Sequence, residues 1–404
     1  MSEPGRVRTV ALLGTSQTLA WASSYYLPAM LAAPMARDLG VSTPTAFAAF
    51  SVALVVSAFV GPWAGRAIDH RGGRPVLMAT NLLFASGLAA LGLAQGPFAL
   101  FVAWALIGVA MGSGLYEAAF STLVRLYGQD SRDPITGITL IAGFASTIGW
   151  PLSTPLEVQF GWRGACFGWA ALHLVLGLPL NAMLPRATTR PAHEAPHPTE
   201  ADAVTTPATD RLHHPLLQAA VLACVFAATW FISTAMAAHL PRLLQAAGAT
   251  LAVAVGVGAL VGPAQVAGRV LEFGFLRRVH PLLSARLAAV AHPVGAATLL
   301  VVGAPAAALF AVLHGAGNGI LTIAKGTLPL VLFGPQAYGA RQGWLMLPAR
   351  VAQALAPFAF GIALDRWGTG ALWLSGALGL SAFVALMLLP KPRCATLAAT
   401  APAA

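Results

Sequence analysis

Long apolar runs constrain this chain more than any other feature. Twelve stretches follow one another, each long enough to cross the hydrocarbon core of a bilayer as a helix of about 20 residues. Only 9% of the residues are charged, whereas soluble domains carry roughly 25%. Lipid must therefore be the solvent, and we predict an all-α polytopic membrane protein. The predicted helices lie at about 9–34, 45–68, 75–95, 97–124, 135–157, 164–184, 215–240, 250–271, 283–303, 305–332, 342–364 and 369–390.

The segment 185–214 interrupts this series. It is rich in Pro, Thr, His and Glu, cannot bury a core, and is typical of a flexible linker. Its four histidines could bind a metal, but a solvated linker is the better interpretation, and we expect neither a metal site nor a cofactor. The chain thus divides into a six-helix bundle at 1–184, the linker, a second six-helix bundle at 215–390 and a tail at 391–404.

The distribution of basic residues predicts the orientation in the membrane. With the N-terminus inside, sixteen Lys and Arg fall in cytoplasmic segments and four in outside segments, as the positive-inside rule requires. Both termini and the linker are then cytoplasmic. The high Ala content and the preference for Arg over Lys indicate a GC-rich bacterial genome, hence the bacterial inner membrane. No basic stripe is interleaved with stacking aromatics, so we do not expect nucleic acid as a partner.

The two halves resemble each other in sequence. GRAID (65–69), preceded by Gly61-Pro62, recurs as GRVLE (268–272), preceded by Gly262-Pro263. PLSTPLEVQFGWRGA (151–165) aligns with PFAFGIALDRWGTGA (357–371) at nearly the same offset. Two ordered matches inside a six-plus-six layout indicate a duplication.

The segment GRAIDHRGGRPVL (65–77) resembles the loop between helices 2 and 3 of the major facilitator superfamily. Gly65, Asp69, Gly72 and Arg74 match that signature, whereas His70 and Gly73 stand where the family usually has arginines. The resemblance implies two pseudo-symmetric six-helix bundles with the substrate between them. The texture of several helices is closest to monocarboxylate-porter-like members. The helix-4 arginine of proton-coupled members is absent, and GWPLS (149–153) replaces the antiporter signature, which counts against a typical drug–proton antiporter.

This loop predicts a gate at the cytoplasmic end. Gly65 would allow two helices to approach closely, and Asp69 would face the positive N-terminus of a helix in the other half. Such a contact exists only while that end is closed. The alternative is that the charges merely anchor helix ends at the lipid headgroups. The predicted gating residues are Gly65, Asp69, Arg71, Gly72, Arg74, Arg269 and Glu272.

Polar and aromatic residues at membrane depth predict the substrate site, because polar groups are costly there and usually serve transport. His314, Asn318, Thr322 and Lys325 share one helical face, as do Gln17 and Trp21. The alternatives are packing for the tryptophans, back-bonding for Thr322, and snorkelling to the cytoplasmic surface for Lys325. The predicted substrate-binding residues are Gln17, Trp21, Tyr25, Tyr116, Trp230, His314, Asn318, Arg350 and Gln353.

Arg350 indicates the charge of the substrate. A guanidinium cannot shed its proton, so it needs a wet cavity or a carboxylate. We expect it to face an anionic ligand, with a structural Arg350–Glu117 pair as the alternative. Within the predicted helices, basic groups outnumber the acids Glu117 and Glu272, which also favours an anion. Proton coupling would need a titrating group, for which Glu117 and His314 are the candidates.

These features predict a secondary active transporter of a small organic anion, such as a monocarboxylate, that works by alternating access. The alternative is efflux of amphipathic drugs or metabolites by proton antiport. We expect no enzymatic activity, because no catalytic motif lies in a water-accessible segment, and a receptor would carry a larger soluble domain. The expected partners are the bilayer, a small-molecule substrate and protons, and we expect a monomer.

Overall fold

Helices make up almost all of the computed structural model, which describes residues 3–186, 215–276 and 279–389. Nearly all of the predicted linker and the whole of the predicted tail lie outside these residues, and the described part contains no strand. The helices are α1 (Glu3–Ser23), α2 (Leu27–Asp38), α3 (Thr43–Arg71), α4 (Gly73–Gly92), α5 (Pro97–Gly114), α6 (Tyr116–Tyr127), α7 (Arg132–Ala142), α8 (Ala145–Leu172), α9 (Leu178–Ala182), α10 (Pro215–Ala246), α11 (Leu251–Gly274), α12 (Pro281–Val302), α13 (Ala307–Phe333), α14 (Tyr338–Trp367) and α15 (Ala371–Leu388).

Eight stretches of the described residues are long and apolar enough to cross a membrane. Two of them, Pro97–Ala182 and Tyr338–Leu388, each contain more than one helix. The prediction of an all-α polytopic membrane protein is therefore confirmed. The number of twelve crossings stays a prediction.

Several helix boundaries differ from the predicted ones, and three of the differences show their cause or their form clearly. The first predicted helix is broken between α1 and α2, where Pro28 near the start of α2 lacks the backbone N–H that a continuous helix would use. The helix predicted at 97–124 is broken at Leu115, whose backbone is extended. The predicted gap between 157 and 164 is instead bridged by α8, which contains a single non-helical residue, Gly161, with a φ of 68°.

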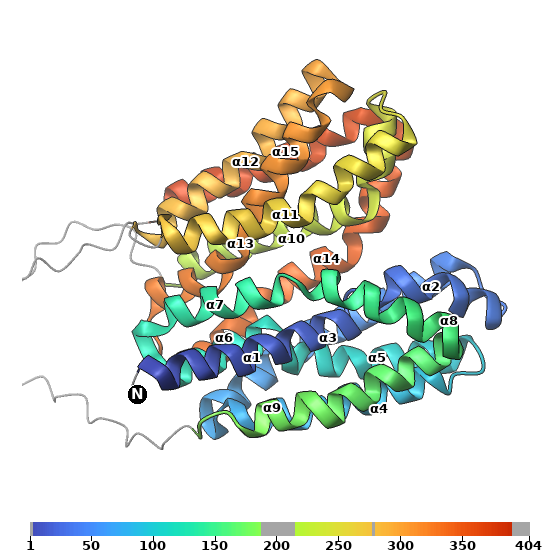
Figure 1. Ribbon diagram of the computed structural model, residues 1–404. Helices are drawn as coiled ribbons and strands as arrows, with labels where there is room; N and C mark the ends of the chain where they lie inside the picture. The colour runs from blue at the N-terminus through green and yellow to red at the C-terminus, as the bar shows by residue number, and fades with distance from the viewer. Residues whose placement is uncertain (1–2, 187–214, 277–278, 390–404) are drawn as a thin grey trace, which may run out of the picture.

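The helices form two groups (Figure 1). Helices α1 to α9, called the first half (residues 3–186), lie together, and α10 to α13 and α15 lie on the other side with α14 between the groups. We call α10 to α15 the second half (residues 215–389). The groups meet at the end that carries the N-terminus and diverge toward the opposite end (Figure 1). We call the end with the N-terminus the predicted cytoplasmic end.

Each half has an ion pair between helix ends at the end opposite the predicted cytoplasmic end, and the two pairs have similar positions. In the first half Arg163 of α8 pairs with Asp38, the last residue of α2. In the second half Arg242 of α10 lies 2.7 Å from Asp365 of α14. The hydrogen bond from Arg163 lowers the pKa of the Asp38 carboxyl. Each of these pairs links two helix ends within one half.

Candidate functional site

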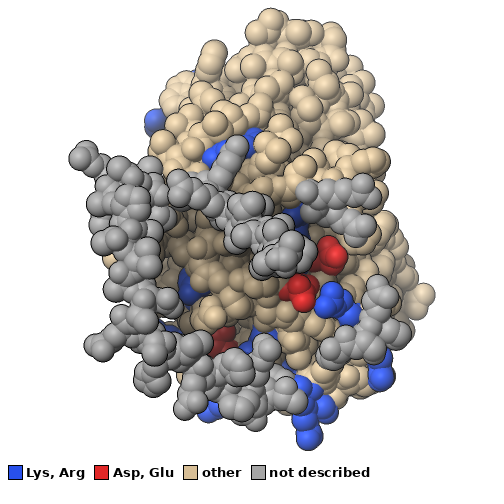
Figure 2. Space-filling view, turned by 90° about the vertical axis from the view of Figure 1, so that its left-hand side faces the viewer, with Lys and Arg blue, Asp and Glu red and all other residues tan. Residues whose placement is uncertain are grey.

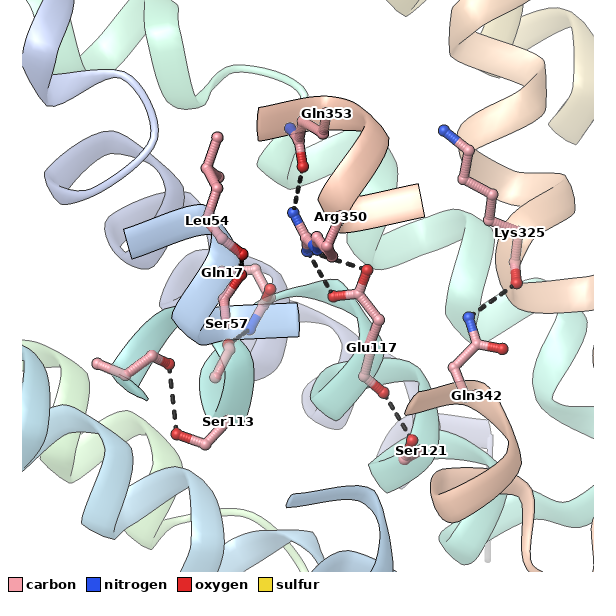
Figure 3. A network of polar contacts seen from close by, with 12 residues as sticks. Gln17, Leu54, Ser57, Ser113, Glu117, Ser121, Lys325, Gln342, Arg350 and Gln353 are labelled. Carbon is pink, nitrogen blue, oxygen red and sulfur yellow. Dashed lines mark hydrogen bonds and ion pairs between the residues drawn. The ribbon is translucent and has the colours of Figure 1, made fainter. Parts of the chain in front are cut away.

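An ion pair joins the halves inside the membrane-spanning part. Nη2 of Arg350 on α14 lies 2.8 Å from Oε2 and 3.0 Å from Oε1 of Glu117, near the start of α6 (Figure 3). The Arg350 side chain is only 4% exposed and that of Glu117 only 14%. The structure therefore has the alternative arrangement of Arg350, paired with a carboxylate, and not the expected one in which it faces an open anion site.

A second buried cation stands beside this pair. Lys325 on α13 is 4% exposed, and its Nζ lies 4.1 Å from the centroid of the Trp230 ring. Arg350 lies over the same ring, with its Cζ 5.1 Å from the centroid. The structure gives the Lys325 ammonium no carboxylate partner among the described residues. The snorkelling interpretation of Lys325 is wrong, because its side chain is held in the interior by the indole.

Four predicted aromatic residues form one cluster around this site. Trp21 of α1 lies parallel to Trp230 of α10, with ring centroids 6.5 Å apart and planes within 6°. Tyr116 and Tyr25 approach Trp21 with centroid distances of 4.8 and 5.3 Å. The sequence pattern predicted these residues separately, and the fold joins them into one cluster in which Trp230 contacts the two cations.

Several buried polar atoms in this cluster lack a partner. Gln17 donates from Nε2 to the Gly114 carbonyl at 2.7 Å, and Gln353 accepts at Oε1 from Arg350 at 3.0 Å. Their other amide atoms remain unpaired. A buried polar group without a partner is costly and calls for an explanation such as a ligand or a water. The unpaired atoms are Gln17 Oε1, Trp21 Nε1, Trp230 Nε1, Thr234 Oγ1 and Gln353 Nε2.

His314 and Asn318 do not join this cluster. They line a separate small cavity within the second half. There Nδ1 of His314 lies 3.1 Å from Nδ1 of His292 on α12, a residue that the sequence analysis missed. A small cavity beside Arg350 and Glu117 shares no lining residue with it. The structure therefore separates His314 and Asn318 from Arg350, with which we had grouped them.

A fully bonded histidine occupies the first half. Nε2 of His173 lies 2.7 Å from the Ser23 hydroxyl, and its Nδ1 lies 2.9 Å from Oδ1 of Asn81. His173 begins a π-helical segment, His173–Gly177, and is completely buried. Because both ring nitrogens have partners, this cluster holds three helical segments together, and His173 has no ring nitrogen left to bind a ligand.

Asp69 links the halves at the predicted cytoplasmic end. Its Oδ1 accepts a hydrogen bond of 2.9 Å from the Gly339 N–H, and its Oδ2 one of 2.8 Å from the Ala340 N–H. These two amides lie in the first turn of α14, so the carboxylate faces the positive end of that helix. The contact has the geometry predicted from the sequence, and its gating role stays a prediction.

Gly65 allows the same two helices to touch. A Cβ on Gly65 would collide with the Gly339 carbonyl, and a Cβ on Gly339 would collide with the Gly65 carbonyl. Residue types larger than glycine would therefore push α3 and α14 apart. The close contact between α3 and α14 thus explains why the sequence signature has glycine at this position.

Glu272 and Arg269 make the corresponding contacts from the second half. Glu272 on α11 is 3% exposed and lies 2.8 Å from Nη2 of Arg132, the first residue of α7. Arg269 donates from Nη1 to the Thr139 carbonyl at 3.1 Å. Arg132 was not among the predicted gating residues, although its position just before an apolar run could have identified it as a helix-end partner.

The remaining predicted gating residues lie around the turn between α3 and α4. Gly72 ends α3 with a φ of 81°, a conformation that favours glycine. Arg71 is exposed and Arg74 is partly exposed. No inter-half hydrogen bond is found for these two arginines among the described residues.

Two helical halves, joined by buried charges and by polar contacts at one end, are the architecture of a secondary transporter. The chain belongs to the Major Facilitator Superfamily, whose sequence profile matches residues 13–320. It is therefore an integral membrane protein of a transporter family.

Relatives with curated names match part of the chain. It is 31% identical over 156 residues to an uncharacterized 38 kDa protein in a 23S RNA operon of Thermoproteus tenax, covering 38% of this chain and 40% of the relative. It is 27% identical over 172 residues to the purine ribonucleoside efflux pump NepI of Escherichia coli O6:K15:H31, covering 42% of this chain and 43% of the relative. The match thus spans less than half the length of these relatives.

The fold matches solved structures over nearly its whole length. The crystal structure of the transporter FucP in the outward conformation superposes with a TM-score of 0.74 at 13% identity, covering 95% of this chain and 99% of that one. At this identity the likeness concerns the fold alone. These matches do not confirm the predicted monocarboxylate-porter-like subtype.

Proposed function

We propose that this protein carries a small organic anion across the membrane by alternating access, with the anion held at Lys325 and Arg350. The observation that carries the proposal is the Lys325 ammonium, buried against Trp230 without a carboxylate partner in the described part of the chain. Arg350 is already balanced by Glu117, so Lys325 leaves the site with surplus positive charge.

The burial of the Lys325 charge favours binding of an anion. A charged group taken out of water without a counter-charge is destabilising by several kcal/mol. An anionic substrate would offset that cost when it binds, so the buried charge of Lys325 favours binding of an anion. Arg269, which is 5% exposed and bonded to a backbone carbonyl, adds to the positive potential of the same interface.

The transport cycle that we propose uses the contacts between the halves. Asp69 and Glu272 hold the predicted cytoplasmic end closed, and rocking of 1–184 against 215–390 breaks these contacts and opens that end. Basic side chains are spread over the face of this end (Figure 2), which favours its placement in the cytoplasm. Both termini would then be cytoplasmic, in a bacterial inner membrane.

The substrate site that we propose combines the cations with the aromatic cluster. Trp21 and Tyr25 would contact the apolar part of the anion, and the unpaired amides would bond its polar atoms. Lys325 is added to the residues predicted from the sequence. From the first half come Gln17, Trp21, Tyr25 and Tyr116, and from the second half Trp230, Lys325, Arg350 and Gln353.

A second candidate function is efflux of an amphipathic metabolite by proton antiport. Two observations favour it: the partial match to a purine ribonucleoside efflux pump, and the parallel Trp21 and Trp230 rings, which suit a flat uncharged base. The two candidates differ in the charge of the substrate. Lys325 favours the anion.

The test is a thermal-shift experiment on the detergent-purified protein with organic anions, neutral nucleosides and cationic drugs. A ligand that binds the native state raises the apparent stability by RT ln(1 + [L]/Kd). Stabilisation by carboxylates that is lost in Lys325→Met, and weakened in Arg350→Ala, supports the anion proposal. Stabilisation by nucleosides or cations alone, unchanged in Lys325→Met, would favour the efflux candidate.

A further inference from the structure

We infer that the proposed anion is an aromatic carboxylate whose flat ring binds between Trp21 and Trp230. This inference rests on the proposed anion transport and specifies its substrate class. Three features carry it: the placement of the two indoles on opposite halves, their unpaired N–H groups, and the position of the Lys325 ammonium.

The first feature is that the indole pair spans the moving interface. Trp21 lies on α1 of the first half and Trp230 on α10 of the second half, with parallel planes and ring centroids 6.5 Å apart. In an alternating-access cycle the halves change their relative position, so a direct indole–indole contact cannot persist in every state. A flat ring placed between the indoles would restore stacking on both of its faces.

A saturated ring or a short aliphatic chain cannot replace that contact in full. Aromatic pairs gain from offset stacking beyond the area that they bury. Two such contacts should correspond to roughly tenfold tighter binding of an aromatic ring than of a saturated ring of similar size. Selectivity for a flat ring is therefore a measurable consequence of the geometry.

The second feature is the pair of unpartnered donors. Nε1 of Trp21 and Nε1 of Trp230 are both buried without a hydrogen-bond acceptor in the described structure. The indole nitrogen can only donate. Each unpaired donor calls for an oxygen acceptor, and a carboxylate carries two acceptor oxygens but no donor.

The third feature fixes where the negative charge must lie. Nζ of Lys325 is 4.1 Å from the Trp230 ring centroid, and Cζ of Arg350 is 5.1 Å from it. Both cations lie over the Trp230 ring, so a ligand that stacks on this indole has positive charge close by. The negative charge of the ligand should therefore lie near Trp230, where the carboxylate can contact Lys325.

The experiment measures the affinity of the full-length purified protein by isothermal titration calorimetry for four probes. Benzoate is aromatic and anionic, cyclohexanecarboxylate is anionic without aromaticity, benzamide is aromatic without charge, and acetate is anionic without a ring. We expect benzoate to bind about tenfold more tightly than cyclohexanecarboxylate, and benzamide at least tenfold more weakly than benzoate. Acetate should bind most weakly of the anions.

Variants test whether Trp230 causes the preference for an aromatic ring. Trp230→Leu should remove the preference of benzoate over cyclohexanecarboxylate, whereas Trp230→Phe should keep the preference and weaken both anions through loss of the N–H donor. Trp373→Leu, at a tryptophan of α15 that is 72% exposed, is the matched control and should leave all affinities unchanged.

The outcomes distinguish the proposed selectivity for an aromatic ring from the proposed binding of an anion. Equal binding of benzoate and cyclohexanecarboxylate by the wild-type protein would overturn the aromatic inference and leave the anion proposal in place. Binding of benzamide with no binding of either ring carboxylate would overturn both. The wild-type ratios alone decide these outcomes, even where a variant does not fold.

Discussion

Arg350 of α14 and Glu117 of α6 hold the two halves together through a bidentate contact, with both carboxylate oxygens within 3.0 Å of one guanidinium nitrogen. The two residues are 233 positions apart in the sequence, and the packing of the halves brings them together. Glu117 thus balances the charge of Arg350, whereas Lys325, which lies over the Trp230 ring, has no carboxylate partner among the described residues.

Loss of the Glu117 carboxylate should destabilise the protein. Arg350 is almost fully buried, so Glu117→Gln would leave it without a counter-charge, at a cost of about 3 kcal/mol. Thermal denaturation in detergent should show a lower midpoint for Glu117→Gln. The double variant Glu117→Gln/Arg350→Met should recover most of the loss, and equal midpoints for wild type and single variant would refute a stabilising pair.

Glu117 is also the predicted site of proton coupling. Protonation of its carboxylate would weaken the contact to Arg350, and Gln imitates the protonated form. In proteoliposomes, Glu117→Gln should lose pH-driven flux and keep counterflow exchange, which needs no net proton movement. Intact pH-driven flux in this variant would remove Glu117 from the coupling mechanism.

Asp69→Asn should shift the protein toward the state that is open at the predicted cytoplasmic end. Loss of a partly buried charge at a helix N-terminus costs up to about 2 kcal/mol, and 1.4 kcal/mol changes a population ratio tenfold. The reporter is alkylation of Met346→Cys in a cysteine-free background, because Met346 is 3% exposed and lines the cavity beside Arg350. A membrane-impermeant maleimide is added to inside-out vesicles.

Asp130→Asn is the control for this prediction, since Asp130 is a highly exposed acid at the same end, 78% accessible. Faster alkylation with Asp69→Asn and an unchanged rate with Asp130→Asn would support a gate. Unchanged rates in both variants would leave Asp69 only the role of anchoring a helix end.

Gly65→Ala should open the same end by steric conflict. The new Cβ would meet the backbone of Gly339, which cannot move aside as a flexible side chain would. The variant should either show faster Met346→Cys alkylation or denature at a lower temperature. Gly256→Ala on α11, where a Cβ meets nothing within 4 Å, should change neither quantity, and a wild-type-like Gly65→Ala would contradict the packing.

The helical membrane fold could be predicted from the sequence because its cause is local. Runs of apolar residues decide it segment by segment, and the resemblance at 65–77 supplied the family. The breaks at Ser23–Leu27 and Leu115 were not predicted, since a short interruption hardly changes the apolarity of a run of more than 20 residues.

The site was predicted only in part, because its contacts depend on how distant helices pack. Trp21, Trp230 and Arg350 were each recognised as unusual in their helices, whereas the Arg350–Glu117 pair stood only as an alternative. His314 and Lys325 share a helical face in sequence, yet the structure directs His314 toward His292 and Lys325 toward Trp230. Periodicity gives the face of a helix but not the neighbour that covers each turn of it.

The most direct test of the account is entrance counterflow in proteoliposomes, with labelled benzoate and labelled lactate as the aromatic and aliphatic anions and labelled inosine as the neutral comparison. The account predicts exchange of an anion by the wild-type protein, at least tenfold slower exchange by Lys325→Met, and no exchange of inosine. Exchange of inosine without exchange of either anion, or undiminished anion exchange by Lys325→Met, would contradict the assignment of Lys325 as the substrate's counter-charge.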